Sequence, residues 1–171
     1  MIAEIQPSFS SHLSMSRKIE YQLSKVKEGN GKVLCTSTGD ELAAMPAYMK
    51  LISQLNDRVK LPYAEFILSL YPGENLSDER WLSLTEEYIE RMGYGKSCYA
   101  VVLNTDKAHS HVHVLLTTID EEGKSIPSGN NYSRSEKISR ELEQKYGLLL
   151  LERERSEEHT SELQSPTNLV C

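Results

Sequence analysis

The sequence predicts one α/β domain, because stretches of alternating apolar and polar residues are interspersed with stretches in which apolar residues recur every three or four positions. Alternation is typical of half-buried strands, and the longer spacing is typical of helices that bury one face. The chain has 171 residues, of which 39% are hydrophobic. This length and composition fit a single domain with a core of ordinary size.

Five stretches are expected to form strands, and the last of them carries the most information. In it Val112 and Val114 alternate with His111 and His113, so both imidazoles should point out of the same face of a sheet. Glu65 lies on the more polar face of an earlier strand. The expected strands cover residues 1–5, 32–36, 63–70, 97–103 and 111–116.

Four helices are expected between these strands. The first begins at about Ser16, after a Ser-rich loop that places His12 on the surface. Ser77 caps the third, and the capping box that begins at Ser133 opens the fourth. On the first helix Tyr21 falls roughly opposite the apolar stripe. The expected helices cover about 16–28, 40 or 46 to 54, 77–92 and 133–146.

Three histidines lie within the ten residues 104–113. Two imidazoles side by side on one strand, His111 and His113, can share a metal ion. Asp106 could accept a ring N–H and fix the tautomer of a ligand, and His109 adds a third imidazole within reach. The alternative is a polar strand face without a ligand role.

The expected role of Glu65 depends on which face of the sheet its side chain lies on. If that face carries the histidine pair, Glu65 is a candidate third metal ligand or general base. Otherwise it is a solvated carboxylate at the edge of the sheet.

Tyr21 points away from the expected core, so it is either available for chemistry or an ordinary surface aromatic. Its surroundings are basic in a chain of formal net charge −6, which suits a phosphate backbone, although a solvated helix face would look similar. Arg134 and Lys137, near the start of the last helix, oppose the helix dipole and indicate an anionic partner. The basic residues around Tyr21 are Arg17, Lys18, Lys25, Lys27 and Lys32.

Several classes of protein are excluded by what the sequence lacks. No stretch approaches the ~18 apolar residues of a membrane span, and the N-terminus lacks the pattern of a secretory signal. We therefore expect a cytoplasmic protein. Cys35 and Cys98 are expected to be packed thiols, since no Cys-x-x-Cys pair indicates a zinc or redox site.

The C-terminal residues need separate treatment. Residues 155–165 resemble the in-frame translation of a sequencing-adapter oligonucleotide. We therefore assign residues 1–154 to the domain. We expect residues 155–171 to be an artefactual, disordered tail, and the natural chain to continue past Glu154.

The chain from Met1 to about Leu151 resembles the relaxase domain of plasmid and transposon mobilisation proteins, a branch of the His-hydrophobic-His endonucleases. Three landmarks carry the resemblance, in the order that the family has them. They are Tyr21 with Lys25-Val26…Gly29-x-Gly31-x-Val33-Leu34; Leu76-Ser-Asp…Glu87-Tyr88…Met92-Gly-Tyr94-Gly95; and Asp106…His111-x-His113…Asp120…Gly123-Lys124…Arg134-Ser135…Glu141-Leu142…Lys145-Tyr146-Gly147-Leu148.

The resemblance implies a central antiparallel sheet with helices packed on it, and binding of single-stranded DNA at a transfer origin. Tyr21 would attack the scissile phosphodiester and stay joined to the 5′ phosphate, while His111 and His113 hold a divalent ion, Mn²⁺ or Mg²⁺, or else Zn²⁺. Further partners implied are accessory mobilisation proteins and a coupling protein. A phenol, with a reference pKa of ~10, needs such help to act as a nucleophile at neutral pH.

Two positions depart from the family pattern. Asn104 stands seven residues before His111, where the family usually has a third metal-binding histidine, and an amide oxygen is a weaker ligand than imidazole for transition metals. Glu65 stands where the family commonly has histidine, and a carboxylate there could replace the missing ligand. Our hypothesis is a site of His111, His113 and Glu65, adjusted by His109 or Asn104.

The alternative is a degenerate, non-cleaving module that binds single-stranded DNA as an accessory to mobilisation, which the net acidity favours. A rolling-circle replication initiator shares the tyrosine and histidine chemistry. However, such proteins usually place the tyrosine after the histidine pair, whereas here Tyr21 precedes it.

Overall fold

The computed structural model describes residues 1–150, which form a five-stranded antiparallel sheet and four α-helices. The order of strands across the sheet is β1-β3-β5-β4-β2, so β5 lies at the centre. The predicted α+β architecture, a central antiparallel sheet with helices packed on it, is therefore confirmed. The strands are β1 (Ile2–Ile5), β2 (Gly31–Thr36), β3 (Tyr63–Ser69), β4 (Ser97–Asn104) and β5 (His111–Asp120).

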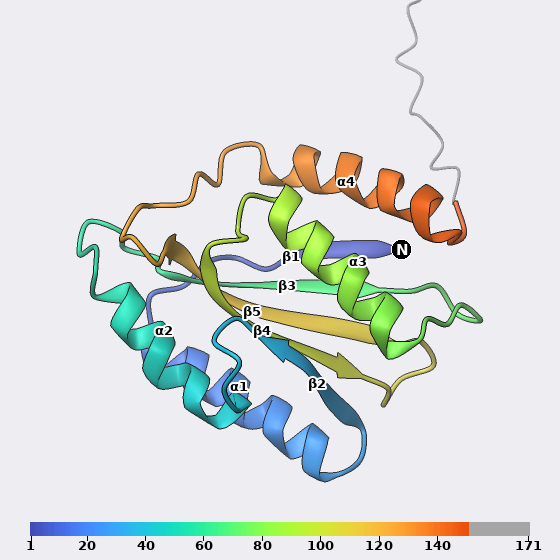
Figure 1. Ribbon diagram of the computed structural model, residues 1–171, viewed down its shortest axis with the longest axis horizontal. Coiled ribbons are helices and arrows are strands. Elements are labelled where there is room, and N and C mark those ends of the chain that lie inside the picture. The colour runs from blue at the N-terminus through green and yellow to red at the C-terminus, as the bar shows by residue number, and fades with distance from the viewer. Residues whose placement is uncertain (151–171) are drawn as a thin grey trace, which may run out of the picture.

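The helices cover both faces of the sheet (Figure 1). One face packs against α1 and α2, and the other packs against α3 and α4, with α4 running alongside β1. The helices are α1 (His12–Lys27), α2 (Met45–Ser53), preceded by a 3-10 turn (Leu42–Ala44), α3 (Asp78–Arg91) and α4 (Asn131–Tyr146). None of the helices within residues 1–150 is long and apolar enough to cross a membrane.

Two clusters of buried side chains hold these layers together. The larger cluster fills the space under α3 and α4, where Trp81 and Tyr88 are fully buried against Phe66. The smaller cluster lies under α1 and α2 and includes Met15 and Leu115. Because side chains alternate along β5, Val112 and Val114 enter the larger cluster and the intervening histidines face the side of α1.

Two helix starts differ from expectation. Helix α1 begins at His12, because the Ser11 hydroxyl accepts a hydrogen bond from the Ser14 amide and caps the helix one turn earlier than predicted. His12 is therefore half-buried beside Tyr63 and does not lie in a surface loop. Helix α4 begins at Asn131 without a side-chain cap, so the predicted capping box at Ser133 does not form.

The other expected elements match the structure to within a few residues. Ser77 caps α3 as predicted, and Pro46 lies in the first turn of α2, where its missing N–H costs no helix hydrogen bond. The adapter-like segment, residues 155–171, lies outside the described residues.

Candidate functional site

His111 and His113 lie side by side on β5, on the face that α1 covers. The centroids of their rings are 5.2 Å apart. His111 is almost completely buried, with 4% of its surface exposed, and His113 is half-buried at the floor of a groove. The period-two alternation of β5 thus brings two imidazoles together at the end of the central strand.

Glu65, on the neighbouring strand β3, contacts the ring of His113. Its Oε1 lies 2.7 Å from Nδ1 of His113, and its Oε2 accepts from Nζ of Lys18 at 2.5 Å. Burial of the Glu65 carboxyl favours its neutral form, but these two hydrogen bonds outweigh burial and hold the pKa of Glu65 below its ordinary value. The ionised carboxylate fixes the proton of His113 on Nδ1 and leaves the other ring nitrogen for a ligand.

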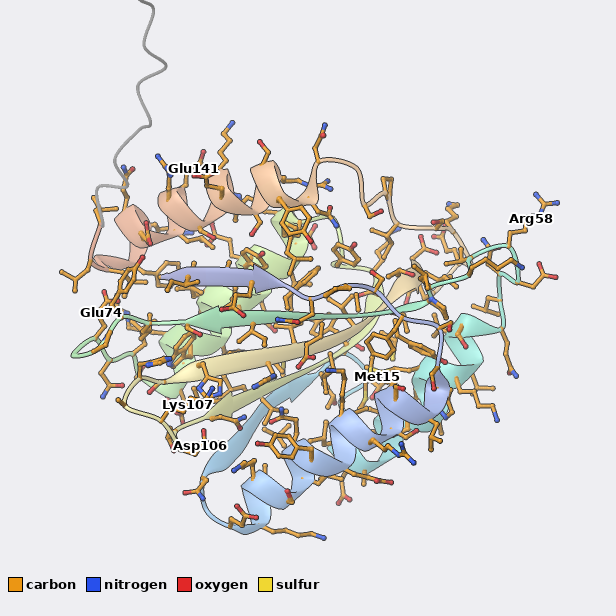
Figure 2. The ribbon with its side chains drawn as sticks, turned by 180° about the vertical axis from the view of Figure 1, so that it is seen from behind. Met15, Arg58, Glu74, Asp106, Lys107 and Glu141 are labelled. Atoms are coloured by element: carbon orange, nitrogen blue, oxygen red, sulfur yellow. The ribbon has the colours of Figure 1, made fainter. Side chains whose placement is uncertain are left out.

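Asp106 lies near His111 but is not hydrogen-bonded to it. Its Oδ1 lies 4.0 Å from Nε2 of His111, and its Oδ2 lies 3.2 Å from Nζ of Lys25. Burial alone would raise the pKa of Asp106, but the Lys25 ammonium lowers it overall. Burial, and next the neighbouring His113, lower the pKa of His111 and favour its neutral form. Figure 2 shows Asp106 in the loop after β4, toward which the C-terminal half of α1 runs.

Asn104 lies directly across the β4–β5 ladder from His111. Its side-chain Nδ2 donates to Oε1 of Gln22 on α1 at 2.9 Å. Its Oδ1 and the Nδ1 of His111 are both buried without a hydrogen-bond partner. An unpartnered amide oxygen and imidazole nitrogen are atoms that bind divalent cations, so the residues present fit an ion at this position.

The predicted set of His111, His113 and Glu65 is brought together but not as three converging ligands. Within residues 1–150, no group of three or more His, Cys, Asp or Glu side chains is arranged to hold a metal ion. Both Glu65 oxygens are already bonded, one to His113 and one to Lys18. The ring of His109 lies 6.2 Å from that of His111, at the edge of the cluster.

Tyr21 projects from α1 on this same side of the sheet, and 54% of its surface is exposed. Tyr21 and His113 line one groove of about 400 Å³, between α1 and strand β3. The ammonium of Lys25 lies 5.4 Å from the centroid of the Tyr21 ring, a cation–π contact. The groove therefore presents a phenol at its rim and an imidazole at its floor.

The basic residues predicted to bind DNA fall into two groups. Arg17, Lys18, Lys25 and Lys27 all lie on α1, and the first two line the groove beside Tyr21. Arg134 and Lys137 lie on α4, which packs on the other face of the sheet.

The guanidinium of Arg134 is also occupied locally. It donates to the carbonyl oxygens of Pro127 and Gly129 at 3.3 and 3.2 Å, and to Oδ1 of Asn131 at 2.5 Å. The structure thus assigns Arg134 to the loop before α4 and separates it from the groove.

Gln22 is the site residue that the sequence did not reveal. It lines the groove next to Tyr21, and only 2% of its surface is exposed. The sequence did contain one signal. Gln22 stands three positions after the buried Ile19, so a polar residue falls on the apolar face of the helix.

An exposed tyrosine and a carboxylate-bonded histidine line one groove on an antiparallel sheet, as expected of a relaxase domain. A family model described as "Relaxase: MobA/VirD2-like, nuclease domain" matches residues 21–148. The chain belongs to this family of MobA/VirD2-like relaxase nuclease domains, as the resemblance indicated.

The fold is also similar to a solved structure from work on the molecular basis of vancomycin resistance transfer in Staphylococcus aureus. The TM-score is 0.51 and the sequence identity is 15%, and the match covers 88% of this chain and 96% of that chain. At this identity the likeness concerns the fold alone. A comparison with curated protein sequences finds no match.

Proposed function

We propose that this protein is a mobilisation relaxase that nicks single-stranded DNA at a transfer origin and becomes joined to it through Tyr21. The observation that supports this most directly is the groove that exposed Tyr21 and His113 line together, with the His111 ring next to that of His113. A tyrosine on the other side of the sheet could not reach a phosphate held at the histidines.

The reaction is a transesterification. The phenol oxygen of Tyr21 forms a bond to phosphorus and the phenol loses its proton, while the bond from phosphorus to the 3′ oxygen breaks and that oxygen gains a proton. The 5′ end stays on the enzyme as a phosphotyrosine, so the reverse reaction can rejoin the strand. Arg17 and Lys18 line the groove and would hold the phosphates on either side of the scissile bond.

His111 and His113 would hold a divalent ion, together with the free Oδ1 of Asn104. When bound, the ion polarises the phosphate oxygens and stabilises the charge that builds on them. Glu65 would orient the His113 imidazole and fix its tautomer through their hydrogen bond, and Asp106 supplies a negative charge 4.0 Å from Nε2 of His111. The mixture of nitrogen and oxygen donors suits Mn²⁺ or Mg²⁺, with Zn²⁺ as the alternative.

The same proposal includes the DNA substrate, the cellular compartment and the partners. The DNA would be the origin of a plasmid or transposon, processed in the cytoplasm with accessory mobilisation proteins and a coupling protein as partners. The natural domain would be residues 1–154.

A second candidate is a module that binds the strand without cutting it. The observation that favours it is Asn104, whose amide is partly used by Gln22 and which supplies a weaker ligand than the imidazole found at that position in the family.

The experiment that separates the two uses the full chain, Mn²⁺ and labelled single-stranded DNA carrying the origin of the element that encodes the protein. We expect a protein–DNA adduct that survives denaturation and disappears in Tyr21→Phe. The matched control is Tyr132→Phe, because Tyr132 is also an exposed tyrosine, at 71% exposure, but lies on α4. Binding without an adduct, with Mn²⁺ shown to be bound, would establish the non-cleaving module.

A further inference from the structure

We propose that Gln22 is a positioning residue, which sets the orientation of Tyr21 by anchoring α1 to the histidine strands through the side chain of Asn104. This inference rests on the proposed role of Tyr21 as nucleophile. It adds a residue that neither the sequence motifs nor the metal ligands include.

The anchor is a buried amide pair. Gln22 and Asn104 are 2% and 1% exposed, and their side chains are joined by the 2.9 Å hydrogen bond across 82 positions of sequence. Without the Gln22 oxygen, the Asn104 amide would be buried with neither of its ends bonded. An unpaired buried polar group is costly, so the pair holds α1 in one rotation about its axis.

This rotation decides where Tyr21 points. Consecutive residues on a helix are about 100° apart, so fixing Gln22 toward the sheet fixes Tyr21 toward the rim of the groove. Gly31 closes the arrangement from the other side, because a Cβ there would lie 3.0 Å from Oδ1 of Asn104 and 3.2 Å from the backbone nitrogen of Val26 on α1. Gly31 thus lets β2 pack closely against both Asn104 and α1, with no room for a side chain between them.

Two ion pairs flank the amide pair but fix the helix less tightly. Lys18, one turn before, bonds Glu65, and Lys25, one turn after, bonds Asp106. The Lys18 side chain is 41% exposed. The Lys25 and Asp106 side chains are 18% and 20% exposed. Only the amide pair has both partners fully buried, so in this proposal it is the contact that most strongly restricts the position of Tyr21.

The first test measures chemistry and binding separately in Gln22→Met, which keeps the length of the side chain and removes its acceptor. We expect the single-turnover rate of adduct formation at saturating DNA to fall at least about tenfold, because a displaced nucleophile loses rate steeply. The DNA dissociation constant, measured with EDTA present, should stay within about twofold. The matched control is Gln144→Met, on the exposed surface of α4, which should change neither quantity.

The second test does not depend on activity. The protein is labelled with 3-fluorotyrosine, and the ¹⁹F resonance of Tyr21 is assigned by its loss in Tyr21→Phe. We expect this resonance to shift or broaden in Gln22→Met while the other tyrosine resonances stay in place. Should Gln22→Met not fold, the double variant Gln22→Met/Asn104→Leu, which leaves no unpaired amide, serves for the same comparison.

The outcomes are distinct. An unchanged Tyr21 resonance overturns the inference, as does a fall in DNA affinity at an unchanged adduct rate. If the wild-type chain forms no adduct, the proposed function fails, and the ¹⁹F comparison alone decides whether Gln22 positions Tyr21.

Discussion

The carboxylate of Glu65 lies 2.7 Å from Nδ1 of His113, across two adjacent strands. The pair places a carboxylate next to Nδ1 of an imidazole that lines the groove. In the proposed function Glu65 would act on an ion through His113, and this role can be separated experimentally from direct ligation.

Glu65→Gln should weaken Mn²⁺ binding about 10- to 100-fold, the usual effect of removing a carboxylate that orients a histidine ligand. Electron paramagnetic resonance of free Mn²⁺ measures the affinity without any DNA. Glu4→Gln, an exposed residue on β1, is the matched control. Equal affinities in wild type and Glu65→Gln would contradict the role given to Glu65.

Gly31→Ala should destabilise the protein by about 1–3 kcal/mol, because the added methyl group meets Asn104 and α1 at contact distances that are too short. Urea denaturation measures the change in the free energy of unfolding. Gly129→Ala provides the comparison, since a Cβ at Gly129 meets nothing within 4 Å. A Gly31→Ala variant as stable as Gly129→Ala would show that this contact relaxes freely.

Arg134→Ala should lower stability by about 1 kcal/mol or more, because its guanidinium ties three acceptors in the loop before α4. DNA affinity should not change. Arg17→Ala, in the groove, should instead weaken DNA binding and reduce the dependence of the dissociation constant on salt by about one counterion. Fluorescence anisotropy at several salt concentrations distinguishes the two variants, and a loss of affinity in Arg134→Ala would place DNA on α4 as well.

The free energy of unfolding should depend on pH through the protonation of His111. Burial and His113 lower the pKa of His111, so below about pH 6.5 the unfolded chain takes up a proton that the folded protein does not. The free energy of unfolding therefore falls as the pH drops through this range, by at most about 1.4 kcal/mol per pH unit for this group.

In His111→Gln this part of the slope should be lost, whereas His109→Gln, in the preceding loop, should retain it. Denaturation with urea in EDTA, between about pH 7.5 and about 5.5, measures both slopes. A slope in His111→Gln equal to that of wild type would show that another group is responsible.

The sequence predicted the elements well where a single local rule decides them. The apolar spacing from Trp81 to Tyr88 predicted one buried helix face, and the structure buries it. The alternation around His111 predicted a half-buried strand, but both faces of β5 are buried because α1 and α2 cover the histidine side. The predicted start of α4 was wrong. Ser133 and Glu136 have the spacing of a capping box, but the helix begins earlier, at Asn131, where Arg134 contacts the preceding loop.

The site was predictable in its members but not in their contacts. The motif and period of β5 placed the histidine pair on one face, and the helical angle placed Tyr21 outside the core. The bonds from Glu65 to Lys18 and from Gln22 to Asn104 join positions 47 and 82 residues apart. Such contacts depend on strand order and helix rotation, which no local pattern encodes.

The central place of β5 also governs how the domain opens. Its backbone is hydrogen-bonded to β3 on one side and β4 on the other, so its amide protons should exchange with solvent only when the whole sheet comes apart. Helix α1 has no such ladder and should exchange through smaller, cheaper openings. We therefore expect openings in which helix α1, with Tyr21, separates from the sheet while β5 stays folded.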